Sequence, residues 1–181
     1  MRYDRVLLEG SPDEKITTCL KVAGWYEGRC VDLTKVKAFY AIGGITLPKG
    51  AERFLSQFHG IAANWFFNEP DGMIRQRCCD IDFKLYPYHD LSNQYNNFYF
   101  DSEWAEIHAE DLQKAAALAG EPVVWVGQIG YYYPAKIYLG STDRIYAINT
   151  YTDKEASYDS IIDLLRGDFC CHDEWVSITV R

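Results

Sequence analysis

The chain has 181 residues, of which 48% are hydrophobic, and a formal net charge of −8. A chain of this length can bury a full core in one domain without metal or disulfide support. The acidic balance argues against nucleic acid as a partner, because binding phosphates requires clustered Lys and Arg. No stretch approaches the roughly 20 apolar residues of a membrane span, and a polar segment follows Met1. We therefore expect a cytoplasmic protein with no signal peptide and no membrane partner.

Six cysteines are present, four of them in the pairs Cys78-Cys79 and Cys170-Cys171. Neither pair has the C-x-x-C spacing of a zinc site, and a cytoplasmic location favours reduced thiols. Neighbouring residues of a strand point to opposite faces, so both thiols of a pair rarely reach one ion. We expect no metal, no cofactor and no disulfide.

Three helices are predicted in the first third of the chain. Ser11 and Pro12 begin the first one in a capping-box pattern, and Gly24 ends it where a left-handed residue is favoured. The residue that follows, Trp25, is expected to fold back into the core. Apolar residues at helical spacing predict two further helices, over 33–42 and 48–60.

After residue 60 the pattern changes to strands, whereas 85–100 has no clear pattern. The predicted elements are strands at 61–67 and 73–83, a helix at 102–119, strands at 123–129, 135–139 and 144–149, a helix at 157–166 and a strand at 175–180. Strand follows strand with few helices between, which predicts one α+β domain over 1–181. N-terminal helices would pack on a largely antiparallel sheet, with one helix between strand groups and one near the C-terminus.

The usual catalytic signatures are missing: the sequence has no glycine-rich nucleotide loop, Walker loop, nucleophile elbow or H-E-x-x-H motif. Asp80 and Asp82 share one face of a predicted strand, about 7 Å apart. A glycosidase needs such a carboxylate pair across a cleft, but two neighbours on one solvated face are the simpler account. We expect a protein that is not an enzyme.

Tyrosine-rich segments are the other notable feature. The three adjacent tyrosines at 131–133 cannot all face a core, and exposed tyrosine supplies contact area at low entropic cost. An aromatic lid over the sheet edge is an equally open alternative. The predicted binding surface comprises Asp80, Asp82, Tyr86, Tyr88, Tyr131, Tyr132 and Tyr133. Its acidic part would steer in a basic protein partner, although solubility alone also accounts for the charge.

Several short segments together resemble a known family. They are 23–29 (AGWYEGR), 31–32 (VD), 44–47 (GITL), 51–60 (AERFLSQFHG), 122–127 (PVVWVG), 137–146 (IYLGSTDRIY) and 157–167 (SYDSIIDLLRG). Their order resembles that of the third subfamily of the SUKH superfamily of bacterial immunity proteins, over roughly 16–167 with a gap at 70–100. The family usually has Gly-Gly where this chain has His59-Gly60.

The resemblance implies a single α+β domain related to the yeast cell-wall-synthesis regulators. It also implies a protein that binds and neutralises a cognate polymorphic toxin by direct contact, without catalysis. Trp25, Phe54, Leu55 and Gly60 would then be core and turn positions, and no toxin-contact residue is assigned, because partner-specific surfaces differ between members. The alternatives are a regulatory or scaffold module without a toxin partner, and an enzyme with an unrecognised site.

Overall fold

The computed structural model describes residues 3–42, 44–67, 77–83, 102–130, 134–149, 151–166 and 175–180. Side chains are described over 6–41, 44–65, 81–83, 109–130, 134–149 and 151–166. None of the helices within these ranges is long and apolar enough to cross a bilayer.

The expected α+β class is confirmed. The elements are β1 (Tyr3–Leu7), α1 (Pro12–Val22), α2 (Thr34–Ile42), α3 (Lys49–Phe58), β2 (Ala62–Phe67), β3 (Arg77–Asp82), α4 (Ser102–Ala119), β4 (Val124–Ile129), β5 (Ala135–Leu139), β6 (Ile145–Asn149), β7 (Lys154–Tyr158), α5 (Ile161–Arg166) and β8 (Trp175–Val180). The strands form one sheet in the order β1-β8-β2-β3-β4-β5-β6-β7, and every pairing is antiparallel.

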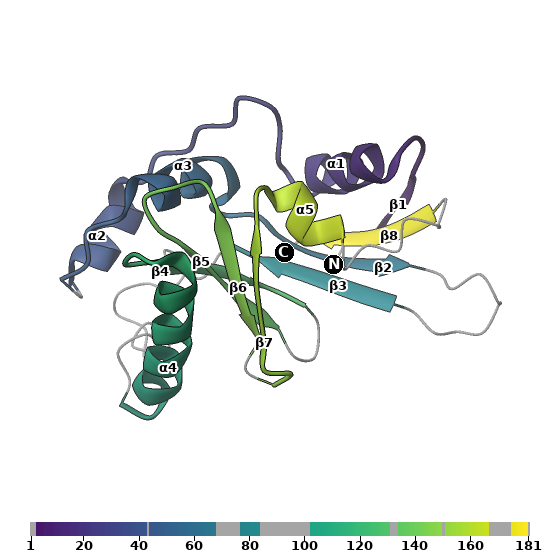
Figure 1. Ribbon diagram of the computed structural model, residues 1–181. Helices are drawn as coiled ribbons and strands as arrows, with labels where there is room; N and C mark the ends of the chain where they lie inside the picture. The colour runs from purple at the N-terminus through teal and green to yellow at the C-terminus, as the bar shows by residue number, and fades with distance from the viewer. Residues whose placement is uncertain are drawn as a thin grey trace.

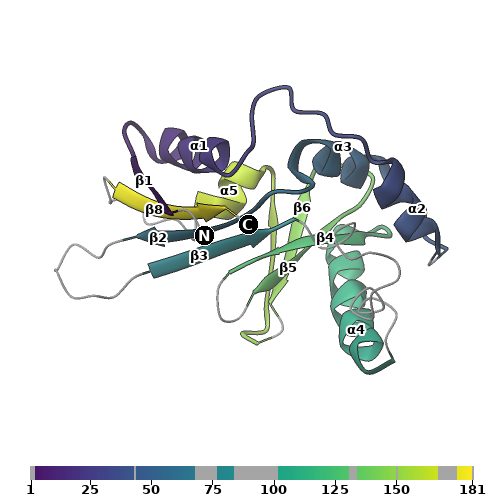
Figure 2. The ribbon, with the colours of Figure 1, turned by 180° about the vertical axis from the view of Figure 1, so that it is seen from behind.

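Helices cover both faces of the sheet. In Figures 1 and 2, α1, α3 and α5 lie along the upper side, whereas α4 lies below and packs against β5, β6 and β7. The side chains of β5 follow the same division, because residues an odd number of positions apart on a strand point to opposite faces. Lys136 reaches Asp111 on α4, whereas Leu139 faces α3 and α5. The half of the sheet formed by β4–β7 therefore has two different environments, one on each face.

The core is aromatic and spans several elements. Trp65, Tyr40 and Tyr138 are the largest fully buried side chains. The Tyr40 hydroxyl donates to the backbone carbonyl of Trp125, which ties α2 to β4. The Trp125 indole donates to the carbonyl of Gly127 at 2.8 Å, where the register of β4 against β5 shifts. Both of these polar groups, the Tyr40 hydroxyl and the Trp125 indole, therefore bond to backbone atoms of β4.

Two strands differ from the sequence prediction. β1 was not predicted because it pairs with β8 from the other end of the chain, and no local pattern reports such a pairing. β7 occupies part of the segment predicted as a helix over 157–166. The helix starts only at Ile161, after Ser160, whose hydroxyl accepts from the Asp163 amide at 3.1 Å. Tyr158 therefore lies on a strand and not on a helical stripe.

The first turn of α3 approaches the turn between β5 and β6 closely. A Cβ atom built on Gly50 would lie 1.6 Å from the carbonyl oxygen of Thr142 and 2.7 Å from that of Gly140. The Ala51 amide donates to the Gly140 carbonyl at 3.2 Å. Since both sides of this contact are backbone, no side chain can move aside to make room.

We predict that Gly50→Ala lowers the free energy of unfolding by about 2 kcal/mol or more, because the new methyl group forces α3 away from the turn. Urea denaturation of both proteins measures the difference. Lys49→Ala, an exposed change one residue earlier, should stay within about 0.5 kcal/mol of the parent protein. A Gly50→Ala protein as stable as the Lys49→Ala control would contradict the close approach.

Candidate functional site

The loop after α1 folds onto α3. Gly24 has a φ of 104°, and the Trp25 amide donates back to the Leu20 carbonyl at 2.9 Å, which turns the chain out of the helix. The Trp25 ring then stacks on Phe58 of α3, with 6.2 Å between ring centroids and 6° between planes. Trp25 packs against the core but stays partly exposed, so the expectation that it enters the core holds only in part.

Arg29 of the same loop holds the C-terminal end of α3. Its guanidinium donates to the carbonyl oxygens of Gln57 and His59, the latter at 2.7 Å. The Val31 amide donates to the Ser56 carbonyl at 2.9 Å. These carbonyls belong to the last turn of a helix, where the partial negative charge of the helix favours a cation. The AGWYEGR segment (23–29) therefore fixes the C-terminal end of α3 by hydrogen bonds and ring packing.

The N-terminal end of α3 is held by the β5–β6 turn. Arg53 donates from Nε to Asp143 Oδ1 at 2.7 Å and from Nη2 to the Ser141 carbonyl at 3.3 Å. Glu121, just after α4, accepts from the Ser141 amide at 3.0 Å and from its hydroxyl. The turn is thus fixed from two sides.

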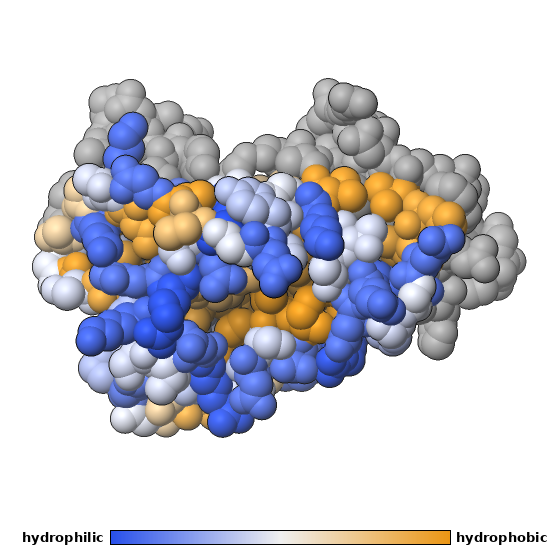
Figure 3. All heavy atoms as spheres, turned by 90° about the horizontal axis from the view of Figure 1, so that it is seen from above, coloured by the Kyte–Doolittle hydropathy of each residue, from blue (hydrophilic) through white to orange (hydrophobic). Residues whose placement is uncertain are grey.

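A groove of about 230 Å³ lies between α3, the β5–β6 hairpin and the start of α5. Its floor is apolar and its rim is polar. The floor consists of Trp25, Phe54, Phe58, Leu139, Ile145 and Ile161, and the rim of Arg53, Gln57, Asp143, Asp159 and Ser160. Seen from above, apolar side chains lie in hollows between polar ones on this face (Figure 3). We call this feature the α3 groove.

Two rim carboxylates point toward solvent. The Asp143 side chain is 70% exposed although it accepts from Arg53. The Asp159 side chain is 83% exposed, and its ion pair with Arg144 is long, at 3.8 Å. Neither acid is desolvated, so both remain available to a cation that approaches from outside.

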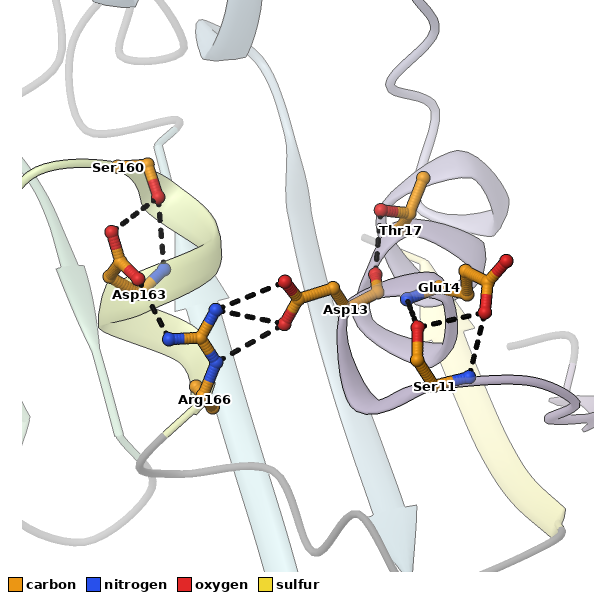
Figure 4. Close-up of polar contacts among 7 residues, drawn as sticks. All are labelled: Ser11, Asp13, Glu14, Thr17, Ser160, Asp163 and Arg166. Carbon is orange, nitrogen blue, oxygen red and sulfur yellow. Dashed lines mark hydrogen bonds and ion pairs between the residues drawn. The ribbon is translucent and has the colours of Figure 1, made fainter.

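A polar cluster holds α5, which forms one wall of the groove (Figure 4). The Arg166 guanidinium donates to both carboxylate oxygens of Asp13 on α1, at 2.9–3.1 Å, and to Asp163 at 2.9 Å. Ser11 and Glu14 form the predicted capping box at the start of α1, in the same view. Helices α1 and α5, which lie far apart in the sequence, are therefore joined by these ion pairs.

The described part contains only two of the seven residues of the predicted surface, so that surface stays a prediction. Asp80 and Asp82 both lie on β3, where Asp80 pairs with Asn64 and Asp82 with Ala62 and Gln128. The Asp82 side chain is partly buried, and that of Asp80 lies outside the described side chains. The five tyrosines at 86, 88 and 131–133 lie outside the described residues.

Sequence reasoning missed the α3 groove. Its rim comes from α3, the β5–β6 turn and the segment before α5, which are far apart in the sequence. The one local signal was the break between the strands predicted at 135–139 and 144–149, because the last residue of that break, Asp143, is a rim acid. Trp25 and Phe54 were singled out, but only as structural positions.

Metal chemistry has no candidate in the residues that the structure describes, since no group of three His, Cys, Asp or Glu side chains is placed to hold an ion. Cys19 is buried, and burial raises the pKa of its thiol to about 12, which keeps it protonated and inert. Cys30 is exposed and is not bonded to another cysteine.

The sequence matches no protein-family model, and neither a curated protein nor a solved structure shows significant similarity to it.

We predict that Trp25→Ala costs about 2–3 kcal/mol of stability, less than for a fully buried ring, because Trp25 keeps part of its surface in solvent. Tyr26→Ala is the matched control: this neighbouring aromatic is 57% exposed and should change stability by less than about 0.5 kcal/mol. Chemical denaturation measures both, and equal losses for the two variants would show that Trp25 does not anchor the loop.

His59 supplies a pH-dependent test of the contact between Arg29 and the C-terminal end of α3. Burial, and next the positive charge of Arg29, lower the pKa of this imidazole from 6.5 to about 4. The unfolded chain then binds the proton more readily than the folded one between these values, so the stability that neutral His59 contributes is full above pH 6.5 and is lost as the pH falls toward 4.

We predict that His59→Gln reduces the loss of stability between pH 7 and pH 4.5 by on the order of 1 kcal/mol, a value discounted for partial exposure. Carboxylates with lowered pKa, such as Glu14 and Glu121, titrate alike in both proteins and cancel in the comparison. Urea melts at a series of pH values give the two curves. Parallel curves would mean that His59 is freely solvated.

Proposed function

We propose that the protein is a bacterial immunity protein that acts in the cytoplasm and binds a cognate toxin domain by direct contact. One observation supports this reading above others. Segments that resemble the SUKH immunity family lie far apart in the sequence but meet around α3: the AGWYEGR loop clasps its C-terminal end, and the 137–146 hairpin holds its N-terminal end. The helix at the end of the last segment, α5, completes the same groove.

The resembling segments are in direct contact with one another in the fold. Here Trp25 stacks on Phe58, Arg29 bonds to the α3 carbonyls, and Gly50 packs against the β5–β6 turn. The contacts support a common unit built from the resembling segments.

The chemistry of the exposed groups fits binding rather than catalysis. The α3 groove presents an apolar floor and exposed acids, which is how a protein-binding surface is composed: an apolar centre with a polar rim. The net charge of −8 would accelerate encounter with a basic toxin domain and repel a like-charged one.

We predict that this protein protects cells when it is co-expressed with the toxin encoded by the adjacent gene, and that the purified pair binds with a nanomolar dissociation constant, roughly −12 kcal/mol. Survival of induced cultures and calorimetric titration measure the two effects. An immunity protein specific for an unrelated toxin is the control and should give no protection. Cell death at the same rate with and without this protein would refute the immunity function.

A further inference from the structure

We propose that the α3 groove is where the partner docks, and that it accepts an apolar side chain of the partner flanked by Lys or Arg. The inference rests on the proposed function and names the contact surface and the chemistry of the segment that fills it. That surface differs from the one predicted from sequence, since none of its residues belongs to the set at 80–88 and 131–133.

The size of the groove indicates which kind of group it can bind. Sites for small molecules and cofactors typically have roughly 300–1,000 Å³. At about 230 Å³, the α3 groove is smaller and open, which suits one large side chain of a protein rather than an enclosed ligand. Its aromatic and aliphatic floor favours an aromatic or long aliphatic anchor, because such side chains gain most from leaving water.

The charges at the rim indicate which charge the partner residues next to the anchor should carry. Among the described residues, Asp159 has only the long contact with Arg144, and Arg144 lies outside the groove lining. Arg53, the cation of the rim, already donates to Asp143 and to the Ser141 carbonyl. An incoming guanidinium or ammonium therefore finds an exposed carboxylate with spare acceptor capacity, whereas an incoming acid finds an arginine whose charge is already paired with Asp143.

The walls are fixed before any partner arrives. Backbone contact at Gly50 sets the distance between α3 and the β5–β6 turn, and the Arg166–Asp13 bonds help to orient α5. A site that exists in the free protein costs little conformational entropy on binding, so even a modest groove can anchor a partner.

The first test needs no toxin. In a nitrogen-15 NMR spectrum the five tryptophans give separate indole signals, and Trp25→Phe assigns the one from Trp25. The probes are the peptides acetyl-Arg-Trp-Arg-amide, acetyl-Glu-Trp-Glu-amide and acetyl-Arg-Gly-Arg-amide. The basic aromatic peptide should move the Trp25 signal to saturation, and the other two should bind at least about 5-fold more weakly. Equal shifts with all three, or none with the first, would overturn the proposal.

Charge variants sharpen this test. Asp159→Asn should weaken the basic aromatic peptide by about 3- to 10-fold. Asp153→Asn is the matched control, because this aspartate is similarly exposed and lies on the β6–β7 turn away from the groove. Equal affinity of the two variants would rule out Asp159 as the cation contact and overturn the rim assignment.

The second test uses the adjacent-gene toxin. Gln57→Trp places a bulky side chain on the rim and should weaken toxin binding at least about 10-fold, whereas Gln113→Trp, at an exposed position of α4, should not. Melting curves check that each variant is folded. If Gln57→Trp does not fold, Asp159→Asn gives an independent measurement of toxin binding. Protection by the parent protein with unchanged binding in both groove variants would refute the docking site and leave the immunity function standing. Absence of protection refutes the immunity function, and the peptide titration still decides what the groove binds.

Discussion

Helix α3 is held at both ends by backbone atoms, and the rest of this face of the molecule depends on that placement. At the N-terminal end, Gly50 lies against the Thr142 carbonyl and the Ala51 amide bonds to Gly140. At the C-terminal end, Arg29 bonds to carbonyls that have no partner within the helix. The contact at Gly50 is backbone against backbone and cannot adjust through rotamers, so α3 and the hairpin move together.

The two faces of the β4–β7 half of the sheet are stabilised differently. On the face under α4, Asp111 is fully buried and pairs with Lys136 at 2.5 Å, an arrangement in which the loss of either partner is usually costly. On the face under α3 and α5 the contacts are apolar, and the charges lie at the rim, where each exposed pair contributes less than about 1 kcal/mol. The Asp111–Lys136 pair is therefore intolerant of change, while the groove rim can vary at little cost.

Periodicity and capping predicted the helices well because these signals are local. The Ser11–Glu14 box and the apolar stripe of α3 needed only a few neighbouring residues. β7 gave no such signal: its residues are exposed or partly exposed, so no alternation marked it, and Ser160 rather than Ser157 caps α5. The α3 groove was beyond local reasoning, because Trp25, Asp143 and Asp159 meet only through the fold, and nothing in their own neighbourhoods distinguishes a rim acid from a solvated one.

The floor and the rim of the α3 groove differ in how much a substitution there would cost. The floor residues Trp25, Phe54 and Phe58 also hold the loop and α3 in place, so replacing them costs stability. Gln57 and Asp159 are exposed, and substitutions at such positions usually change stability by less than about 0.5 kcal/mol. Substitutions at the rim can therefore change its shape and charge at little cost to the floor beneath. For the toxin partner proposed above, this separation between a fixed floor and a variable rim would let specificity change without loss of the fold.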